Sequence, residues 1–167
     1  MSKTNVPYRG RDRLAVAYIR GGPLAPCISG IVWFEEVKHG TLVTVKVCGL
    51  PPFQPAQGDQ APIGPLGFHL HVNGTCQIGD PSDPFQAAGG HYNPYNQPHG
   101  NHAGDFPVLF SNDGFAYMQF FTNKFSVADA IGRTVIIHQN PDDYRSQPSG
   151  NSGLRLACGV VRPWYDC

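Results

Sequence analysis

The chain has 167 residues, the length of one ordinary domain with a single hydrophobic core. No uninterrupted apolar run approaches the roughly 18 residues that a membrane-spanning helix needs, which excludes a helical membrane protein. Twelve Lys and Arg balance twelve Asp and Glu, so no excess charge exists to hold a nucleic-acid backbone or an anionic membrane. We expect one domain over residues 1–167, with a flexible N-terminus over residues 1–12 and without nucleic-acid or membrane partners.

The N-terminus carries basic residues but lacks an apolar stretch of about 7 to 15 residues followed by a small-residue cleavage site. It therefore predicts a cytoplasmic protein, and an exported form stays open only if the N-terminus is trimmed. The five cysteines are too few for a disulfide scaffold and fit no zinc-finger spacing. At most two bridges can form among Cys27, Cys48, Cys76, Cys158 and Cys167, which leaves one thiol free.

Strand signals occur as short apolar or alternating segments between turn residues. Residues 41–47 show the alternation most clearly, because three valines on one face alternate with Thr44 and Lys46 on the other. The predicted strands, in chain order, cover residues 14–19, 28–37, 41–47, 68–72, 115–121, 134–138 and 154–161. A helical turn is predicted over residues 126–132, ended by Gly132. Seven or eight short strands without a long helix predict an all-β fold, an antiparallel sandwich or barrel.

Residues 73–114 contain no periodic segment. A structureless stretch of about 40 residues inside a compact domain needs an organiser of its own. A ligand, a disulfide or a metal ion would serve.

Five of the seven histidines lie between residues 69 and 102, which an ordinary β-domain does not require. His69 and His71 are two residues apart on a predicted strand, so both imidazoles point to the same face. Such a pair is a potential chelate, although taken alone it is more often structural. His138 taken alone ends a strand without a special role, and His39 is predicted to be a solvated side chain in a turn.

His99, His102 and Asp105 place two imidazoles and one carboxylate within seven residues, with glycines that let the backbone fold around a common point. Imidazoles with one carboxylate oxygen form a normal tetrahedral zinc set, whose fourth ligand comes from elsewhere. The alternative is a polar surface loop with fortuitous histidines. His91 lies between the two histidine groups and could serve either.

Five stretches taken together resemble the copper/zinc superoxide dismutase family, particularly its bacterial forms. They occur in the expected order at residues 67–71 (GFHLH), 88–94 (AGGHYNP), 99–105 (HGNHAGD), 132–138 (GRTVIIH) and 150–159 (GNSGLRLACG). A weaker match over residues 14–50 supplies the opening strands. The resemblance implies a Greek-key, immunoglobulin-like β-barrel or sandwich of about eight strands, with long metal-binding and active-site loops.

The resemblance further implies copper and zinc as cofactors. The implied copper ligands are His69, His71, His91 and His138. The implied zinc ligands are His91, His99, His102 and Asp105. His91 would therefore be a bridging imidazolate. The chemistry agrees with this division, because four nitrogen donors suit tetragonal Cu(II), whereas three nitrogens and one oxygen suit tetrahedral zinc.

Two further positions match functional residues of the family. Asp142 matches a carboxylate that accepts hydrogen bonds from one copper ligand and one zinc ligand, here implied to be His69 and His99. Such contacts fix the tautomer and orientation of metal ligands. Arg155 matches the arginine beside copper, whose permanently charged guanidinium can attract and orient a small anion.

The cysteines divide into two groups in the light of the resemblance. Cys76 and Cys158 match the family's intrasubunit disulfide, which pins the long loop to the barrel. The alternative for this pair is two buried thiols. Cys27, Cys48 and Cys167 match no residue with a role in the family.

The implied activity is superoxide dismutation by ping-pong redox at copper. One superoxide reduces Cu(II) and leaves as O2, and a second oxidises Cu(I), takes up two protons and leaves as hydrogen peroxide. Arg155 and His91 are the implied catalytic residues, with His91 protonated and released from copper in the reduced state. Superoxide is thus the expected partner; the family also suggests a homodimer and a copper chaperone, without fixing the dimer surface or the copper donor.

The sequence departs from the family pattern in two ways. The segment from His138 to Arg155 is short and lacks the acidic and lysine cluster that many animal and plant members use around the channel. Lys124, Arg133 or Arg145 would have to guide the anion instead. The lack of an export signal is the second departure, because many bacterial relatives are exported.

Two other functions stay open at this point. A noncatalytic metal-binding module of the same fold would hold zinc for structure or carry copper to a partner. Arg155 and His138 distinguish the enzyme from this module, because a structural or storage role needs neither residue. An adhesive β-sandwich with accidental histidines predicts no stoichiometric metal.

Overall fold

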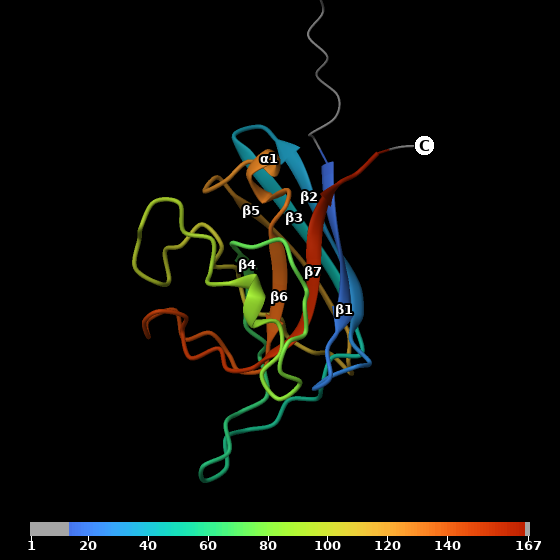
Figure 1. Ribbon diagram of the computed structural model, residues 1–167, viewed down its shortest axis with the longest axis vertical. Coiled ribbons are helices and arrows are strands. Elements are labelled where there is room, and N and C mark those ends of the chain that lie inside the picture. The colour runs from blue at the N-terminus through green and yellow to red at the C-terminus, as the bar shows by residue number, and fades with distance from the viewer. Residues whose placement is uncertain (1–13, 166–167) are drawn as a thin grey trace, which may run out of the picture.

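The computed structural model describes residues 14–165, so the flexible stretch expected over residues 1–12 and Cys167 lie outside the described residues. The described chain forms seven strands and two short helical turns (Figure 1). The strands are β1 Leu14–Gly21, β2 Ser29–Val37, β3 Gly40–Cys48, β4 Phe68–His71, β5 Ala116–Thr122, β6 Thr134–His138 and β7 Arg155–Pro163. The helical turns are the 3-10 turn η1 Gln86–Ala88 and the α-helical turn α1 Val127–Ala130. Neither turn has the length or apolar character to cross a membrane.

All seven strands belong to one antiparallel sheet in the order β4-β6-β7-β1-β2-β3-β5. After the β1–β2–β3 meander the chain makes long connections, and β7 returns to pair with β1, which gives a Greek-key order. The sheet curls around its interior (Figure 1). The predicted all-β class is confirmed, with seven strands among the described residues where the sequence predicts about eight.

The core follows from the alternation of side chains along the strands. In β2, Val32 and Phe34 are fully buried, and in β3 the same is true of Val43 and Val45, while the residues between them lie on the outer face. These side chains belong to one continuous hydrophobic cluster. The strand register is therefore fixed, because a slip by one residue would expose the whole apolar set.

Strand β4 is buried on both of its faces. Phe68 and Leu70 belong to the hydrophobic cluster, whereas His69 and His71 point to the opposite side, and all four residues have no exposed surface. A buried imidazole must find polar partners, so the second face of β4 has to be covered by polar groups from elsewhere in the chain.

The long connection between β4 and β5 supplies this cover by pairing with the free edge of β4. The backbone N–H of Leu70 donates to Gly104 at 2.9 Å, and the Leu70 carbonyl accepts from Tyr92 at 2.7 Å. Two pairs of polar residues lie opposite each other in this arrangement, His69 with Asp105 and His71 with His91. Figure 1 shows this connection and the β6–β7 loop projecting from the same flank of the sheet, beyond β4 and β6.

A disulfide between Cys76 and Cys158 fastens the start of the long connection to β7. The pairing implied by the family resemblance is therefore confirmed, and Cys27 and Cys48 are exposed free thiols. Around the disulfide, Phe85 packs with neighbouring apolar side chains into a second, smaller hydrophobic cluster. This cluster fixes the segment around η1 on the sheet.

We predict that Cys76→Ser lowers the free energy of unfolding by roughly 4 kcal/mol, because a crosslink spanning 82 residues removes much of the conformational entropy of the unfolded chain. Denaturant titration of the oxidised protein measures the change. Cys48→Ser is the matched control, since Cys48 is exposed and unbridged. Equal stability of the two variants would contradict a stabilising crosslink.

Candidate metal centre

Two groups of four potential metal ligands adjoin each other beneath the loops. The first contains only imidazoles, from His69, His71, His91 and His138. The second contains three imidazoles and a carboxylate, from His91, His99, His102 and Asp105. Within each group, one ligand atom from each residue lies within 4.8 Å of all the others. The structure thus brings together every residue that the resemblance assigns to copper or zinc, with His91 in both groups.

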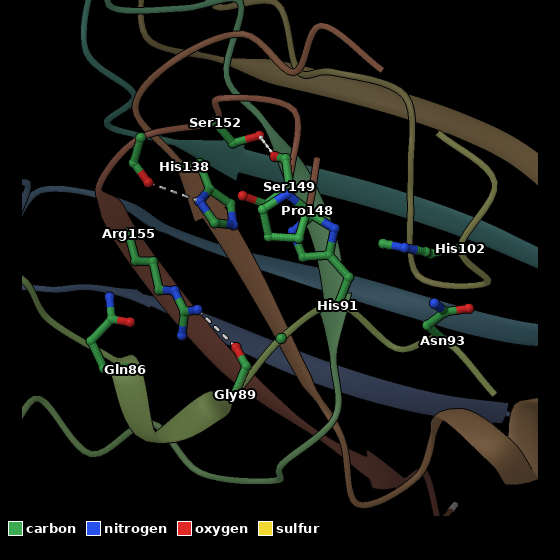
Figure 2. Close-up of a pocket in the computed structure, with 12 residues that line it drawn as sticks. Gln86, Gly89, His91, Asn93, His102, His138, Pro148, Ser149, Ser152 and Arg155 are labelled. Carbon is green, nitrogen blue, oxygen red and sulfur yellow. Dashed lines mark hydrogen bonds between the residues drawn. The ribbon is translucent and has the colours of Figure 1, made fainter. Parts of the chain in front are cut away.

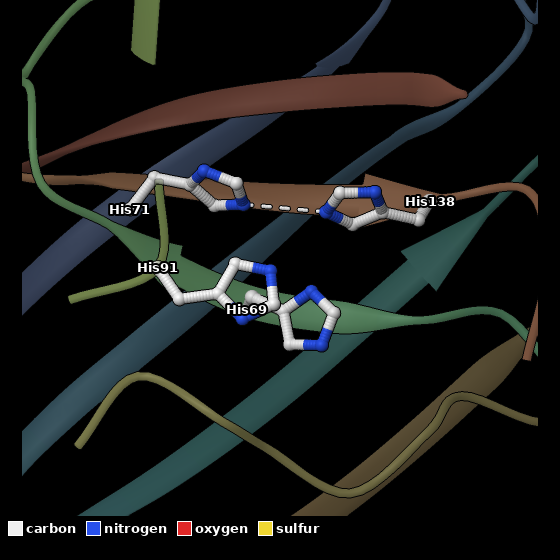
Figure 3. A group of neighbouring side chains, drawn as sticks. All are labelled: His69, His71, His91 and His138. Carbon is white, nitrogen blue, oxygen red and sulfur yellow. Dashed lines mark hydrogen bonds between the residues drawn. The ribbon is translucent and has the colours of Figure 1, made fainter. Parts of the chain in front are cut away.

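Adjacent strands position three of the four imidazoles in the first group (Figure 3). His69 and His71 come from β4, and His138 ends the neighbouring strand β6, where the register with β7 shifts. Such an irregularity re-aims a side chain relative to the regular ladder. His91 arrives from the long connection and stacks on His69, with ring centroids 3.8 Å apart.

The hydrogen bonds of His71 and His138 determine which ring nitrogen carries the proton. Nδ1–H of His71 donates to the Gly89 carbonyl at 2.9 Å, and Nδ1–H of His138 donates to the Gly153 carbonyl at 3.3 Å. A carbonyl oxygen only accepts, so in each neutral ring Nε2 carries a lone pair. These two Nε2 atoms lie 3.2 Å apart (Figure 3). Two lone pairs at this distance repel unless a cation lies between them.

The other two rings of the first group, those of His69 and His91, each have a ring nitrogen that faces the centre of the group without a hydrogen-bond partner. Nε2–H of His69 donates to Asp142 at 2.7 Å, which leaves its buried Nδ1 without a partner. Nε2 of His91 is likewise buried without a partner. Buried polar atoms without partners are rare, and here they converge as the all-nitrogen donor set that suits Cu(II). The residues of this group therefore fit a copper ion.

The second group converges on one carboxylate oxygen. Oδ1 of Asp105 lies 2.8 Å from Nδ1 of His91, 3.3 Å from Nδ1 of His99 and 3.2 Å from Nδ1 of His102. Its other oxygen accepts the backbone N–H groups of Gly100 and His102, each at 2.9 Å, which hold the carboxylate in place. Three imidazole nitrogens and one carboxylate oxygen form a closed tetrahedral zinc set, so this group fits zinc.

Asp142 joins the two groups. Its buried carboxylate accepts Nε2–H of His69 at 2.7 Å and Nε2–H of His99 at 2.8 Å, one oxygen for each ring. It also accepts the backbone N–H of Tyr144 at 2.7 Å. One carboxylate therefore fixes the tautomer and the orientation of a ring in each group, in the place that the resemblance implied.

Burial keeps the rings of the first group neutral. Desolvation, followed by the charges of neighbouring imidazoles, holds the pKa of His69 and His71 well below the ordinary histidine value. The same desolvation lowers the pKa of His138 to about 3. Burial alone would raise the pKa of Asp105, but its hydrogen bond to His91 reverses the shift, so that the carboxyl stays ionised. Neutral imidazoles and an ionised carboxylate are the forms that bind metals.

A pocket of about 630 Å³ adjoins both groups, because His91 and His138 of the first group and His102 of the second are among its lining residues (Figure 2). His91, His138 and Arg155 line it, and Figure 2 shows Arg155 beside His138 on the same wall. The guanidinium of Arg155 donates to the carbonyls of Phe85 and Gly89, both at 2.7 Å. The Gly89 carbonyl thus holds Arg155 and, through Nδ1, the imidazole of His71.

The three basic residues predicted as guides for an anion do not line this pocket. Nζ of Lys124 donates to the His102 carbonyl at 3.3 Å, behind the second group. Arg133 lies over the ring of Tyr92, 3.6 Å from its centroid. Arg145 belongs to the β6–β7 loop.

Sequence reasoning did not identify several residues that build the centre. The carbonyl of Gly89 leaves no side-chain signal, and only its place in the AGGH stretch points to it. Gln147 holds the backbone of His99 at both its N–H and its carbonyl, at 2.9 and 3.3 Å. Tyr144 ties the β6–β7 loop to the long connection by donating to Phe106 at 3.1 Å.

The comparisons with known proteins agree with this geometry. The sequence profile of the family described as Copper/zinc superoxide dismutase (SODC) matches residues 28–161, so the chain belongs to this family. The chain is 36% identical over 142 residues to the Cu-Zn superoxide dismutase 2 of Aquifex aeolicus. The matched segment covers 76% of this chain and 75% of the relative.

Two further relatives show the range of similar proteins. The structure of the Cu/Zn superoxide dismutase from Brucella abortus superposes with a TM-score of 0.70 at 29% identity, covering 88% of this chain and 98% of that chain. The superoxide dismutase-like protein YojM of Bacillus subtilis is 37% identical over 115 residues, which cover 60% of this chain and 57% of the relative.

Gly150 provides a test of the packing around Asp142. Its φ is +67°, and an added Cβ would overlap the Asp142 carboxylate and the His99 ring. We predict that Gly150→Ala weakens zinc binding by roughly 10- to 100-fold, because groups that orient metal ligands contribute at this level. Chelator competition measures the affinity. Gly132→Ala is the matched control, since Gly132 has φ +79° but open space for a Cβ; equal affinities would contradict the prediction.

The metal-free protein should lose stability as the pH falls from about 7 toward 3. The pKa of His138 is about 3 in the folded protein and roughly 6.5 in an unfolded chain, so between these values the unfolded state binds more protons. In the middle of this range His138→Gln should reduce the pH dependence by about 1.4 kcal/mol per pH unit. Urea titrations of both metal-free proteins at several pH values measure it. If stability depended on pH equally in both proteins, the pKa of His138 would be the same in the folded and unfolded states, and the prediction would be wrong.

Proposed function

We propose that the protein is a superoxide dismutase, which converts two superoxide anions and two protons into O2 and hydrogen peroxide. The observation that carries this proposal is the pair of complete ligand groups sharing His91, directly beneath a pocket that contains Arg155. A complete copper group that opens to a pocket, next to a closed zinc group, suits redox chemistry on a small molecule.

In this proposal His69, His71, His91 and His138 hold copper, and His91, His99, His102 and Asp105 hold zinc. When bound, copper supplies a one-electron couple between Cu(II) and Cu(I), and zinc supplies a fixed charge that organises the loop. The protein's own contribution is to attract the anion, orient it and exchange a proton beside it.

Arg155 attracts and orients the substrate. Its guanidinium is half-buried on the pocket wall, and its bonds to Phe85 and Gly89 fix the plane of the group. A planar cation with several N–H donors can hold a diatomic anion by two parallel hydrogen bonds. A lysine could supply the charge but not this fixed geometry.

His91 is suited to hold and return a proton at Nε2. This atom is buried, has no hydrogen-bond partner and belongs to a ring that lines the pocket. Nδ1 of the same ring points into the second group, 2.8 Å from Oδ1 of Asp105, so a zinc ion bound there would keep the ring in place whether or not Nε2 carries a proton. We therefore propose His91 as the bridging ligand and as the proton donor to the reduced substrate.

A noncatalytic metal-binding module of the same fold is the second candidate. The similarity to a protein named superoxide dismutase-like supports keeping it. Two features of the site favour the enzyme. His138 completes the four-nitrogen group, and Arg155 places a fixed cation in the pocket, and neither feature is needed to store a metal.

Metal content and superoxide consumption, measured on one purified sample before and after adding copper and zinc, test the proposal. We expect about one copper and one zinc per chain, with activity that disappears when copper is removed and returns when it is restored. Zinc alone, with copper refused or inert once bound, would establish the noncatalytic module instead.

Two substitutions should separate the roles of the two groups. His138→Ala removes a nitrogen donor from the first group only, so it should abolish turnover, a loss of at least 100-fold, and leave zinc content largely intact. Asp105→Ala removes the oxygen on which the second group converges, so it should lower zinc content and loosen the long connection, as seen by limited proteolysis. Full activity in both variants would contradict the ligand assignment.

A further inference from the structure

The pocket offers an incoming anion little positive charge from the protein. Among the residues that line it, Arg155 is the one with a permanent charge, and the others are histidines or carry uncharged side chains. Any charged group close to Arg155 therefore has a large influence on how strongly the pocket attracts an anion.

One carboxylate lies next to this wall. Gln86 lines the pocket, and its Nε2 donates to Oδ1 of Asp83 at 2.8 Å. Phe85 lies between these two residues in the sequence, and its backbone carbonyl accepts a hydrogen bond from Arg155. The short segment over residues 83–86 thus holds the guanidinium with its backbone and presents a carboxylate with its side chain.

We propose that Asp83 limits the rate at which superoxide reaches the pocket, because its negative charge offsets part of the field of Arg155. This inference rests on the proposed function. The hydrogen bond from Gln86 keeps the carboxylate beside the pocket wall, so the effect is built into the loop rather than left to a freely rotating side chain.

The charge of Asp83 also acts on the protonation of Arg155. Burial lowers the pKa of the guanidinium, and the charge of Asp83 raises it again. A carboxylate that stabilises the cation must also weaken the potential that the cation projects, because the two charges belong to the same local field.

Asp80 is the other charged residue between Cys76 and His91, and its surroundings differ from those of Asp83. Asp80, in the same connection, accepts from the backbone N–H and the hydroxyl of Ser82 at 2.8 and 2.7 Å and bonds to no residue of the pocket wall. Asp80 is therefore a matched control for the total charge of the protein.

The experiment compares Asp83→Asn, Asp83→Ala and Asp80→Asn with the unchanged protein, each loaded with copper and zinc. Asn keeps the acceptor for Gln86 and removes only the charge, whereas Ala removes both. We expect both Asp83 variants to consume superoxide about twofold to threefold faster at an ionic strength near 0.01 M, and to match the unchanged protein near 1 M, where the Debye length is only about 3 Å. Asp80→Asn should give a smaller increase.

A second readout needs neither metal nor turnover. In the metal-free protein, phenylglyoxal reacts with the neutral guanidine, so loss of the Asp83 charge should speed modification of Arg155 while leaving the exposed Arg162 unchanged, as measured by peptide mass spectrometry. An Asp83→Asn protein with unchanged rates at low salt would overturn the inference. So would a change in Asp83→Ala alone, since that points to the hydrogen bond. Failure of the unchanged protein to consume superoxide would overturn the proposed function itself, and the modification experiment would still test whether Asp83 acts on Arg155.

Discussion

The structure depends on a cluster of neutral imidazoles whose lone pairs are forced together in the interior. His71 and His138 each use one ring nitrogen to donate to a backbone carbonyl, which leaves the two facing nitrogens, 3.2 Å apart, with lone pairs. Desolvation lowers the pKa of both rings, so protonation does not relieve the repulsion near neutral pH. The fold thus buries a set of nitrogen donors that a bound cation would satisfy.

The ring nitrogens that point away from the centre of the cluster explain why two long loops are needed. A short strand can aim two imidazoles at one side, but each ring then requires an acceptor for its other nitrogen. The long connection supplies the Gly89 carbonyl, and the β6–β7 loop supplies Asp142 and the carbonyl of Gly153. The disulfide of Cys76 anchors the first of these loops to β7. The Gly89 carbonyl also accepts a hydrogen bond from the guanidinium of Arg155. The conformation of the long connection therefore sets both the orientation of the ligand His71 and the position of Arg155.

The sequence predicts the strands well because β-branched and aromatic residues alternate with polar ones, and each segment that it indicates overlaps a strand of the sheet. It also identifies the residues of both ligand groups, since their spacing and the family resemblance agree. It does not predict the contributions of the backbone. The carbonyl of Gly89 has no side chain to mark it, and the requirement for glycine at position 150 arises only because the β6–β7 loop passes against Asp142. The pairing of the long connection with β4 depends on isolated bridges, which have no periodic pattern.

We propose that two ions bind side by side, with His91 as a ligand to both. A crystal structure of the protein loaded with copper and zinc, with diffraction measured at the absorption edges of both metals, would locate each ion. We expect one copper held by the first group and one zinc held by the second, with His91 contacting both. A single ion in the cluster, or two ions of which neither contacts His91, would show that this proposal is wrong.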